Sequence, residues 1–348
     1  MSDVSPSALG MGARAASQQC ASAVVMIRPA AFDYNPETAA TNKMQQLPET
    51  ERHVAALGGG LDVEPSAPTD TGAYRSAAAR ALDEFDGFVN ALRSEGVSVC
   101  AFADPADPPK PDAVFPNNWV SFHPDGTVVL YPMQAESRRW ERNPDVIEAV
   151  ERDLGYKVRR VVDLTHREAE GRFLEGTGSL VLDHVERLAY ACLSPRTDGE
   201  VVEEWCRETG YEPVIFSALD RSGAPFYHTN VMLCIGARAA VVGAEAIVEK
   251  DRGRVLERVR GSGREVIEIG QAEIAKFAGN MLELASWDEA LGDYRVLVMS
   301  DAARQALSRE AFARLSATTD EVLTVPVPTI ERLGGGSVRC MMAEVFVQ

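Results

Sequence analysis

Short apolar runs alternate with amphipathic stretches along most of the chain, and the same order of segments recurs. Five of the apolar runs begin at or just after a motif that contains polar residues, and these motifs start 50 to 61 residues apart. The motifs are Phe115-Pro116-Asn117-Asn118, Phe173-Leu174-Glu175-Gly176, Tyr227-His228-Thr229-Asn230, Phe277-Ala278-Gly279-Asn280 and Val338-Arg339-Cys340-Met341. A recurring order of apolar runs and helical stretches is typical of an α/β protein. We therefore expect about five similar α/β units.

Each unit is expected to contain a hairpin of two strands, a helix and a short closing strand. The first unit begins with the apolar residues Val24 to Ile27. Second strands are expected at 127–131, 187–192 and 239–242, helices at 77–94, 143–153, 199–208, 245–260 and 308–315, and closing strands at 97–102, 157–162, 213–216 and 265–269. Five such units can close into a ring, which would leave no free strand edge and would place equivalent positions around one axis.

Two segments lack a hydrophobic period and are expected to lie outside the core. Residues 1–21 contain small and turn-forming residues and predict a disordered leader, so that residues 22–348 form a single catalytic domain. Residues 42–71 are polar and rich in glycine and proline, which predicts a long surface loop of the kind that often covers a site.

The composition is that of a globular protein that acts on a small molecule. The 348 residues are 45% hydrophobic and 25% charged, enough for a core and an ordinary surface. A formal net charge of −17 repels phosphate backbones and anionic bilayers, so nucleic acid and membranes are not expected partners. The sequence leaves open whether the chain forms a homo-oligomer. It contains no run of about 18 apolar residues and no apolar secretory stretch, and we expect a cytoplasmic location.

The cysteines and histidines do not predict disulfides or a metal site. The six cysteines are widely spaced without a C-x-x-C pair, so all are expected to be reduced. The five histidines form no cluster with metal-ligand spacing, and we expect neither a metal nor another cofactor. His123 and His184 lie in hairpin contexts and are expected to face solvent.

Three polar residues of the recurring motifs have the chemistry of a nucleophilic site. If the units surround one axis, Cys340, His228 and Glu175 meet in one cleft, as nucleophilic catalysis at an electrophilic carbon requires. A free cysteine is more often a small buried apolar residue than a nucleophile. Cys340 differs from the other cysteines because a glycine triplet at 334–336 precedes it, which lets backbone approach a ligand closely.

Four stretches resemble the motifs of the superfamily of arginine deiminases, dimethylarginine hydrolases and amidinotransferases, and the resemblance spans nearly the whole chain. They are 112–119 (DAVFPNNW), 173–176 (FLEG), 228–230 (HTN) and 334–341 (GGGSVRCM). The residues 26–29 (MIRP) and 35–39 (NPETA) further resemble a bacterial branch of citrulline hydrolases. The resemblance implies a five-bladed α/β propeller, or pentein, with pseudo-fivefold ββαβ units. It also implies that Cys340 is the nucleophile, His228 the general acid/base, and Glu175 a partner of the substrate or of His228.

Two departures from the superfamily pattern favour citrulline as the substrate. Where arginine deiminases have aspartates that bind the guanidinium, this chain has Asn118 and Asn230. A guanidinium has only donors and a positive charge, whereas a ureido group is neutral and has a carbonyl oxygen that needs a donor. We therefore expect hydrolysis of citrulline to ornithine, ammonia and carbon dioxide through a covalent cysteine adduct. Asp112 and Asn117 are also expected to contact the substrate.

Several alternatives stay open at this point. Arginine dihydrolases share an asparagine in this pattern, so an arginine dihydrolase or deiminase is the nearest alternative, and an amidinotransferase would share the first covalent step. A non-catalytic binding protein is a third, since the same fold serves in a ribosome anti-association factor. Arg28, Arg172 and Arg339 are each candidate partners for a substrate carboxylate.

Overall fold

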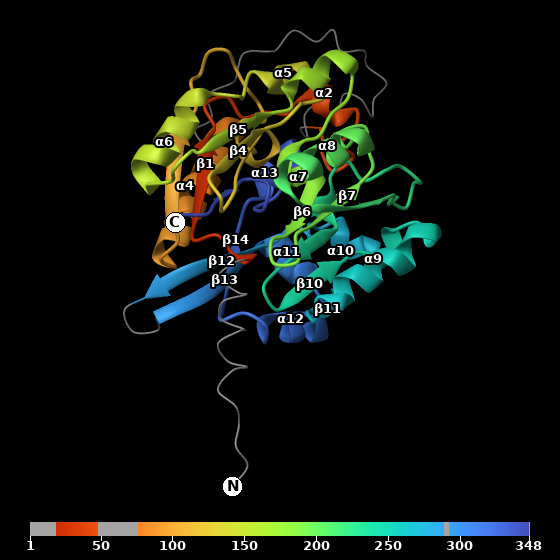
Figure 1. Ribbon diagram of the computed structural model, residues 1–348. Helices are drawn as coiled ribbons and strands as arrows, with labels where there is room; N and C mark the ends of the chain where they lie inside the picture. Colours follow the sequence, from red (N-terminus) through yellow and green to blue (C-terminus); the bar gives the residue numbers. More distant parts are fainter. Residues whose placement is uncertain (1–18, 48–75, 289–291, 348) are drawn as a thin grey trace, which may run out of the picture.

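The computed structural model describes residues 19–47, 76–288 and 292–347. Within these residues the strands form five separate three-stranded sheets (Figure 1). In each sheet the central strand pairs antiparallel with one neighbour and parallel with the other. The sheets are β15 (Ala343–Val345), β1 (Ala23–Arg28) and β2 (Ser98–Ala103); β3 (Val120–Phe122), β4 (Thr127–Leu130) and β5 (Arg160–Asp163); β6 (Leu180–Asp183), β7 (Leu188–Cys192) and β8 (Glu212–Phe216); β9 (Leu233–Ile235), β10 (Ala239–Val242) and β11 (Glu265–Glu268); and β12 (Leu282–Asp288), β13 (Gly292–Ser300) and β14 (Glu321–Val325).

Helices connect the central strand of each sheet to its parallel neighbour. These are α4 (Ala77–Ser94), α6 (Pro144–Leu154), α8 (Gly199–Thr209), α9 (Glu249–Gly261), and the pair α11 (Asp301–Ala306) and α12 (Arg309–Ser316). Side-chain caps define several of their starts, because a cap satisfies backbone donors that have no partner within the helix. Ser76 accepts from the amide of Ala79, and Asp198 accepts from the amides of Glu200 and Val201. The expected ββαβ unit is therefore present five times.

Short helices also occur. They are α2 (Pro36–Ala39), α5 (Glu136–Arg139), α7 (Gly176–Ser179), α10 (Gln271–Ile274), α13 (Pro328–Gly334), and the 3₁₀ helices η1 (Pro116–Asn118), η2 (Thr165–Glu170), η3 (Thr229–Val231) and η4 (Ala244–Ala246). Of these, α2, α5 and η4 lie in the same connections as the longer helices, and the others lie in the remaining connections.

Most expected elements occur within a few residues of their predicted bounds. The helix expected at 77–94 and the strand expected at 239–242 have those bounds. The helix expected at 245–260 begins only at Glu249, because residues 244–246 form η4 instead. The strand expected at 157–162 begins at Arg160. Apolar spacing predicts the middle of an element better than its ends, where caps and turns decide.

The last strand of the chain joins the first one and closes the ring of blades. β15 pairs antiparallel with β1, with Ala23 opposite Val345. The first strands of neighbouring sheets also pack together, β15 beside β3 and β6 beside β9. The fold is thus the expected five-bladed α/β propeller. The expectation that closure leaves no free strand edge is wrong, because the five sheets do not hydrogen-bond to one another and each keeps two edge strands.

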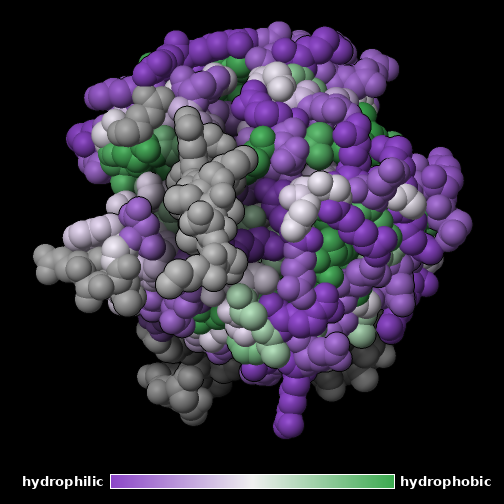
Figure 2. Space-filling model, turned by 60° about the horizontal axis from the view of Figure 1, so that its bottom comes forward, coloured by the Kyte–Doolittle hydropathy of each residue, from purple (hydrophilic) through white to green (hydrophobic). Residues whose placement is uncertain are grey.

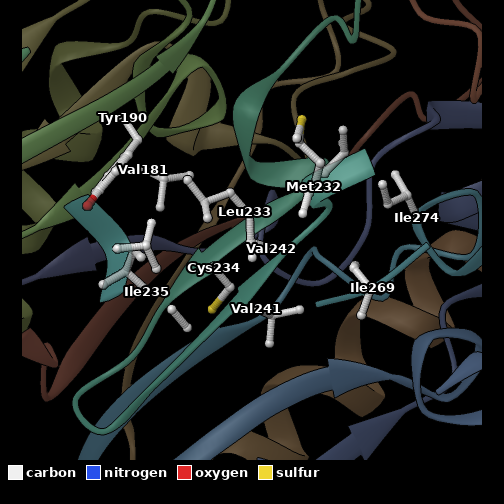
Figure 3. Close-up of a cluster of buried hydrophobic side chains, with 14 of the residues drawn as sticks. Val181, Tyr190, Met232, Leu233, Cys234, Ile235, Val241, Val242, Ile269 and Ile274 are labelled. Carbon is white, nitrogen blue, oxygen red and sulfur yellow. The ribbon is translucent and has the colours of Figure 1, made fainter. Parts of the chain in front are cut away.

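Apolar side chains fill the spaces between the sheets and their helices. Figure 3 shows one such cluster, in which Leu233 and Cys234 of β9 lie with Val241 and Val242 of β10. Ile269, just after β11, belongs to the same cluster. Every residue of β9 and β10 is buried, as expected for short strands covered on both faces.

The surface is mainly polar. Figure 2 shows a face that is largely hydrophilic, with apolar residues in small separate patches, in keeping with the charged content of 25%. Among the described residues, no helix is both long enough and apolar enough to cross a bilayer.

Three expectations about exposure change with the structure. The leader was expected to reach residue 21, but Gln19, Cys20 and Ala21 are buried, and the amide of Gln19 donates to the carbonyls of Leu182 and Ile235. His123 is buried as well, and its ring lies 2.8 Å from the hydroxyl of Ser121. His184 is half-buried. Residues 1–18, and 48–71 of the expected long loop, lie outside the described residues.

Candidate active site

The polar residues of the five motifs lie at equivalent places, immediately before the first strand of each sheet. Asn117 and Asn118 lie in η1 before β3, and Glu175 precedes α7 and β6. His228 and Asn230 belong to the turn of η3 before β9. Asn280 precedes β12 and Cys340 precedes β15. Because the first strands of neighbouring blades lie side by side, these short turns meet at one end of the ring.

A small pocket of about 260 Å³ lies at this meeting point. Cys340 and His228 both line it, while Glu175 lies behind His228. The complete lining consists of Thr38, Asn42, Asp112, Phe115, Asn118, Arg138, Arg196, Tyr227, His228, Gly334, Gly335, Gly336 and Cys340. The structure thus brings the three predicted catalytic residues to one place, although they are far apart in the sequence.

Two side-chain amides surround the sulfur of Cys340. The Nδ2 atom of Asn280 lies 3.3 Å from Sγ, and the Nδ2 atom of Asn230 lies 3.5 Å from it. The Asn230 amide also donates to the carbonyl of Thr177 at 3.1 Å. Cys340 is buried and follows the glycine triplet, and its own amide donates to the carbonyl of Ser337. The sulfur therefore sits in a polar environment despite its burial.

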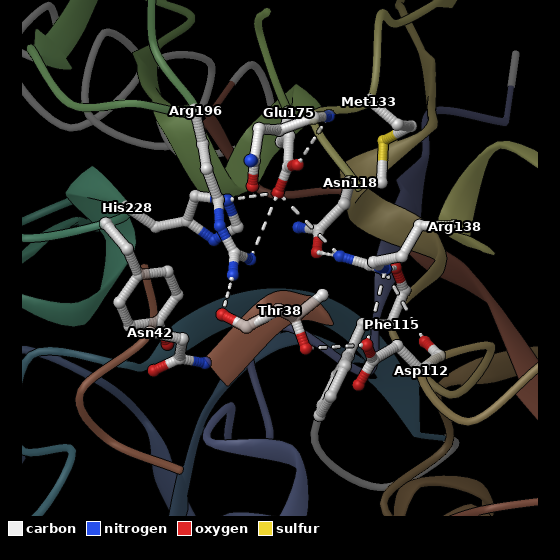
Figure 4. Close-up of polar contacts among 12 residues, drawn as sticks. Thr38, Asn42, Asp112, Phe115, Asn118, Met133, Arg138, Glu175, Arg196 and His228 are labelled. Atoms are coloured by element: carbon white, nitrogen blue, oxygen red, sulfur yellow. Dashed lines mark hydrogen bonds and ion pairs between the residues drawn. The ribbon is translucent and has the colours of Figure 1, made fainter. Parts of the chain in front are cut away.

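His228 and Glu175 form a buried pair (Figure 4). The Nε2 atom of His228 lies 2.8 Å from Oε2 of Glu175. A carboxylate only accepts hydrogen bonds, so it fixes the imidazole tautomer with the proton on Nε2 and leaves the lone pair on Nδ1. Burial lowers the pKa of His228 to about 4, although Glu175 acts to raise it. The imidazole is therefore neutral near pH 7 and can accept a proton.

Gly178 allows three blades to approach one another closely at this pair, namely its own blade, the blade of Asn118 and the blade of His228. A Cβ atom on Gly178 would lie 2.6 Å from Nδ2 of Asn118 and 2.6 Å from Nδ1 of His228. Real Cβ atoms do not come so near to other heavy atoms, so a side chain here would separate the two residues. Glycine is the residue type that permits such an approach.

Two buried arginines, which the sequence did not single out, complete the charges around Glu175 (Figure 4). Nη1 of Arg196 lies 3.4 Å and Nη1 of Arg138 lies 3.8 Å from Oε2 of Glu175. Burial acts to raise the pKa of Glu175, but Arg196, the hydrogen bond from His228 and Arg138 together hold it well below its usual range. Arg138 also forms a bidentate pair with Glu141 at 2.8 Å, and burial raises the pKa of Glu141 to about 7. No local motif marks these arginines, since they lie in a four-residue helix and in a loop after β7.

Asp112 and Asn118 line the pocket on the same side as Arg138. Oδ2 of Asp112 accepts from Asn35 at 2.8 Å and from Thr38 at 3.1 Å, whereas Oδ1 is buried without a hydrogen-bond partner among the described residues. Oδ1 of Asn118 accepts from Arg138 at 2.7 Å. Because a guanidinium only donates, the Asn118 amide must turn its oxygen toward Arg138 and its nitrogen away.

Asn117 lies behind Asn118 and does not line the pocket. Its Oδ1 atom accepts from Nδ2 of Asn118 at 2.9 Å, and its own Nδ2 atom is buried without a partner among the described residues. Asn117 therefore helps to orient Asn118, and its contact with a substrate stays a prediction.

None of the three arginines proposed from the sequence as carboxylate partners reaches the pocket. Arg28 pairs with Asp86 on the surface. Arg172 pairs with Glu200 at the surface, and Arg339 binds Glu344 and the carbonyl of Met342. The arginines that line the pocket are Arg138 and Arg196.

The chain segment from Asn35 to Gln46 contributes two lining residues, Thr38 and Asn42, to the pocket. The carbonyl of Thr38 accepts from Nη2 of Arg196 at 2.6 Å, and Thr41 accepts from its Nε atom at 2.8 Å. On the other side, the amide of Asn42 donates to the carbonyl of Gly335 at 3.1 Å. This segment thus connects the arginine side of the pocket to the glycine triplet.

The part of the chain that the structure describes contains no group of three or more His, Cys, Asp or Glu residues that could hold a metal ion.

The propeller fold, with a cysteine, a histidine and a glutamate at one end of its axis, is that of the guanidino-group-modifying superfamily. Residues 69–347 match the family described as N,N dimethylarginine dimethylhydrolase, eukaryotic, and the chain belongs to this family. Membership supports a hydrolase of carbon–nitrogen bonds. Among curated protein sequences, none matches the chain significantly.

Solved structures share the fold at low sequence identity. ArgZ, an arginine dihydrolase from the ornithine-ammonia cycle in cyanobacteria, is 17% identical with a TM-score of 0.64, and the match covers 93% of this chain but only 40% of ArgZ. The N-terminal domain of an ArgZ variant covalently bound to a reaction intermediate has the same identity and TM-score, and the match covers 92% of this chain and 97% of that domain.

A dimethylarginine dimethylaminohydrolase variant in an adduct with S-methyl-L-thiocitrulline is also similar. It is 18% identical with a TM-score of 0.55, and the match covers 92% of this chain and 98% of that one.

Proposed function

We propose that the protein hydrolyses the ureido group of L-citrulline to ornithine, ammonia and carbon dioxide, with Cys340 as nucleophile and His228 as general acid and base. The observation that carries this proposal is the state of the charges around Cys340. The carboxylate of Glu175 is already matched by Arg138, Arg196 and His228. The side chains that form hydrogen bonds with the sulfur among the described residues are the neutral amides of Asn230 and Asn280.

This distribution suits a neutral substrate head group better than a cation. A buried guanidinium needs an unpaired carboxylate beside it, because an uncompensated charge in a buried site is costly. In this proposal Asp112, whose Oδ1 atom has no partner among the described residues, binds the α-ammonium group and not the head group. A ureido group needs a donor for its oxygen and acceptors for its nitrogens. Asn118 directs its oxygen to Arg138 and one proton of its nitrogen to Asn117, so the second proton of that nitrogen is the one left for a substrate carbonyl.

The reaction balances with one water molecule. His228 takes the thiol proton of Cys340, and the thiolate adds to the ureido carbon. The bond from that carbon to the δ-nitrogen breaks as His228 returns the proton to that nitrogen, which releases ornithine and leaves a carbamoyl group on sulfur. Water, deprotonated by His228, then adds to the carbamoyl carbon, the carbon–sulfur bond breaks, and the released carbamate yields ammonia and carbon dioxide.

Asp112 supports an α-amino acid as the substrate. Its Oδ1 atom is buried without a partner among the described residues, and it lines the same pocket as Cys340. A buried carboxylate oxygen requires a donor, and the α-ammonium group of an amino acid supplies three. Desolvation by burial raises the pKa of Asp112, and a bound ammonium group would lower it again.

Hydrolysis of arginine or dimethylarginine is the second candidate. It is favoured by the family match and by the likeness to ArgZ, whose name states an arginine dihydrolase. In this reading Glu175 would bind the guanidinium despite its two arginine neighbours.

Product analysis with citrulline, arginine, agmatine and dimethylarginine, in which ammonia, dimethylamine and the remaining amino acid or amine are all measured and Cys340→Ser is the control, separates the candidates. We expect the highest kcat/KM for citrulline and one ammonia per ornithine. Two ammonia molecules per ornithine from arginine, with no turnover of citrulline, would establish an arginine dihydrolase instead. Absence of turnover with all four compounds would contradict both candidates.

A further inference from the structure

Asn280 lies in a tight and strained turn. Phe277 has a φ of 60° although it is not glycine, and the amide of Asn280 donates to the carbonyl of Phe277 at 2.8 Å. For a bulky residue this backbone region is unusual and costs free energy, so its surroundings must hold it there. Phe277 and Ala278 are buried, and the amide of Ala278 donates to the carbonyl of Glu273. Strain of this kind occurs preferentially at functional sites.

The turn of residues 277–280 packs closely against the blade that carries Asn230. A Cβ atom on Gly279 would lie 2.6 Å from the carbonyl oxygen of Val231 and 2.8 Å from Cα of Met232. Only glycine allows the two backbones to come this close. The approach brings the side chain of Asn280 to the carbonyl of Asn230, to which its Nδ2 atom donates at 3.1 Å.

The orientation of the Asn280 amide follows from its neighbours. The backbone amide of Arg339 donates to Oδ1 at 3.1 Å, and a backbone N–H can only donate. The oxygen of the amide must therefore face Arg339, and the nitrogen must face the other way. Its two protons then point at the carbonyl of Asn230 and at Sγ of Cys340, which is 3.3 Å away.

We propose that Asn280 is a catalytic residue, whose amide donates a hydrogen bond to the sulfur of Cys340 and stabilises it as the thiolate that attacks the substrate. This rests on the proposed role of Cys340 as nucleophile. A thiol sulfur accepts hydrogen bonds weakly, whereas an ionised acceptor forms bonds about twice as strong, so this contact favours the charged form. Asn230 differs from Asn280, because its Nδ2 atom lies 3.5 Å from the sulfur while its Oδ1 atom, at 3.7 Å, can accept from the thiol.

Other charged or titratable groups face the sulfur across the pocket. They are Tyr227 and His228 before η3, Asp112 before η1, Arg138 in α5 and Arg196 after β7. None of them has a hydrogen bond to Sγ among the described residues, whereas Asn280 does. An aspartate in place of Asn280 would keep the acceptor for Arg339, but it would direct a second carboxylate oxygen at the carbonyl of Asn230 and at the sulfur.

The test is the rate of inactivation by iodoacetamide as a function of pH, without substrate, with the labelled peptide identified by mass spectrometry. The variants are Asn280→Ala and Asn280→Asp. Asn143→Asp is the matched control, since it makes the same charge change at the cap of α6. Burial raises the pKa of Cys20 well above its usual range, that of Cys100 to about 11 and that of Cys192, Cys206 and Cys234 to about 12, and the labelled peptide distinguishes Cys340 from all of them.

We expect the midpoint of the pH profile for Cys340 to rise by about 1 unit in Asn280→Ala and by at least about 2 units in Asn280→Asp. Asn143→Asp should leave it unchanged. With a substrate that the wild-type protein hydrolyses, kcat of the Asn280 variants should fall by a larger factor than KM rises. Melting temperatures identify a variant that does not fold, in which case the other variant decides.

An unchanged midpoint in a folded Asn280→Asp protein would overturn the proposal. The labelling experiment does not depend on the substrate, so it separates this proposal from the proposed function. A shifted midpoint in a protein that does not hydrolyse citrulline would uphold Asn280 and reject the citrulline assignment. An unchanged midpoint in a protein that hydrolyses citrulline would reject the role of Asn280 and uphold the citrulline assignment.

Discussion

Cys340 and Cys234 are both buried thiols, and they lie in two very different regions of the same propeller. Cys234 lies in β9 among Leu233, Val241 and other apolar side chains, away from the pocket (Figure 3). Burial raises its pKa to about 12, so it is protonated at neutral pH. Cys340 lies at the pocket, with the amides of Asn230 and Asn280 directed at its sulfur.

The difference shows that burial alone does not make a reactive cysteine. Exclusion from water favours the neutral thiol, and only donors or positive charges nearby can reverse this preference. The polar region around Cys340 holds such groups because the turns before five first strands meet there. The region around Cys234 is mainly apolar, and the carboxylate of Glu283, which lines the same small cavity, adds to the effect of burial in raising the pKa of the thiol.

The largest effect should come from exchanging the two thiols for inert residues. We expect Cys340→Ser to lower kcat by about 10⁴-fold or more, because a hydroxyl lacks the thiolate character that the attack requires. Cys234→Ala should leave kcat within about twofold and cost roughly 1–2 kcal/mol in the free energy of unfolding. Steady-state kinetics measure kcat, and urea unfolding measures the free energy of unfolding, for both variants. Near-normal activity of folded Cys340→Ser would remove it as the nucleophile.

The next effect concerns the charges of the polar region. Glu175→Gln leaves Arg138 and Arg196 without their shared carboxylate and replaces the charged acceptor of His228 by a neutral amide, whose nitrogen can only donate. We expect kcat to fall by roughly 10²–10⁴-fold, and the free energy of unfolding to fall by about 3–5 kcal/mol. The exposed Glu186→Gln is the control and should change neither quantity measurably. A fully stable and active Glu175→Gln protein would show that neither stability nor catalysis depends on the negative charge of Glu175.

A smaller effect is expected for substrate choice. Asn118→Asp combined with Asn230→Asp replaces amides by groups that only accept, and adds negative charge suited to a cation. Arg138, 2.7 Å from Oδ1 of Asn118, can pair with the new carboxylate at that position, which favours folding. We expect the ratio of kcat/KM for citrulline to that for arginine to fall at least about 100-fold, or roughly 2.7 kcal/mol. An unchanged ratio would mean that these asparagines do not discriminate between citrulline and arginine.

The smallest effect is on stability and depends on pH. The pKa of His228 is about 4 in the folded protein because of burial, against 6.5 for an unperturbed histidine. Between these values the unfolded chain binds more protons at this residue than the folded chain, so stability is lost as the pH falls through this window. From pH 7 to pH 5 the loss should be about 2 kcal/mol.

The comparison of wild type with His228→Gln isolates this contribution. Glu141, whose pKa burial raises to about 7, acts in the opposite direction because its folded form takes up a proton more readily. Glu141 is present in both proteins, so its contribution cancels. Urea unfolding at pH 7 and pH 5 should show a smaller acid-induced loss in His228→Gln. Equal losses in the two proteins would mean that His228 is not held neutral by burial.

The sequence by itself determined the order of the blades and the places of most strands and helices. Apolar periodicity records which face of an element is buried, and this local property can be read without the fold. The recurring motifs also identified the positions before the first strands, and with them Cys340, His228, Glu175 and Asn118. Their register in the repeat was the signal, since equivalent positions in a ring of blades lie around one axis.

Only the tertiary structure decided which charges and amides surround those residues. Arg138 and Arg196 reach Glu175 from a short helix and a loop that carry no periodic signal. Asn280 reads as a simple turn residue in the sequence, yet it touches Cys340 because Gly279 packs against Met232. Arg28, Arg172 and Arg339 are indistinguishable from pocket arginines in the sequence, but each has another partner. Such contacts depend on distances of a few ångströms between segments far apart in the chain, and a local pattern of apolar and polar residues does not encode those distances.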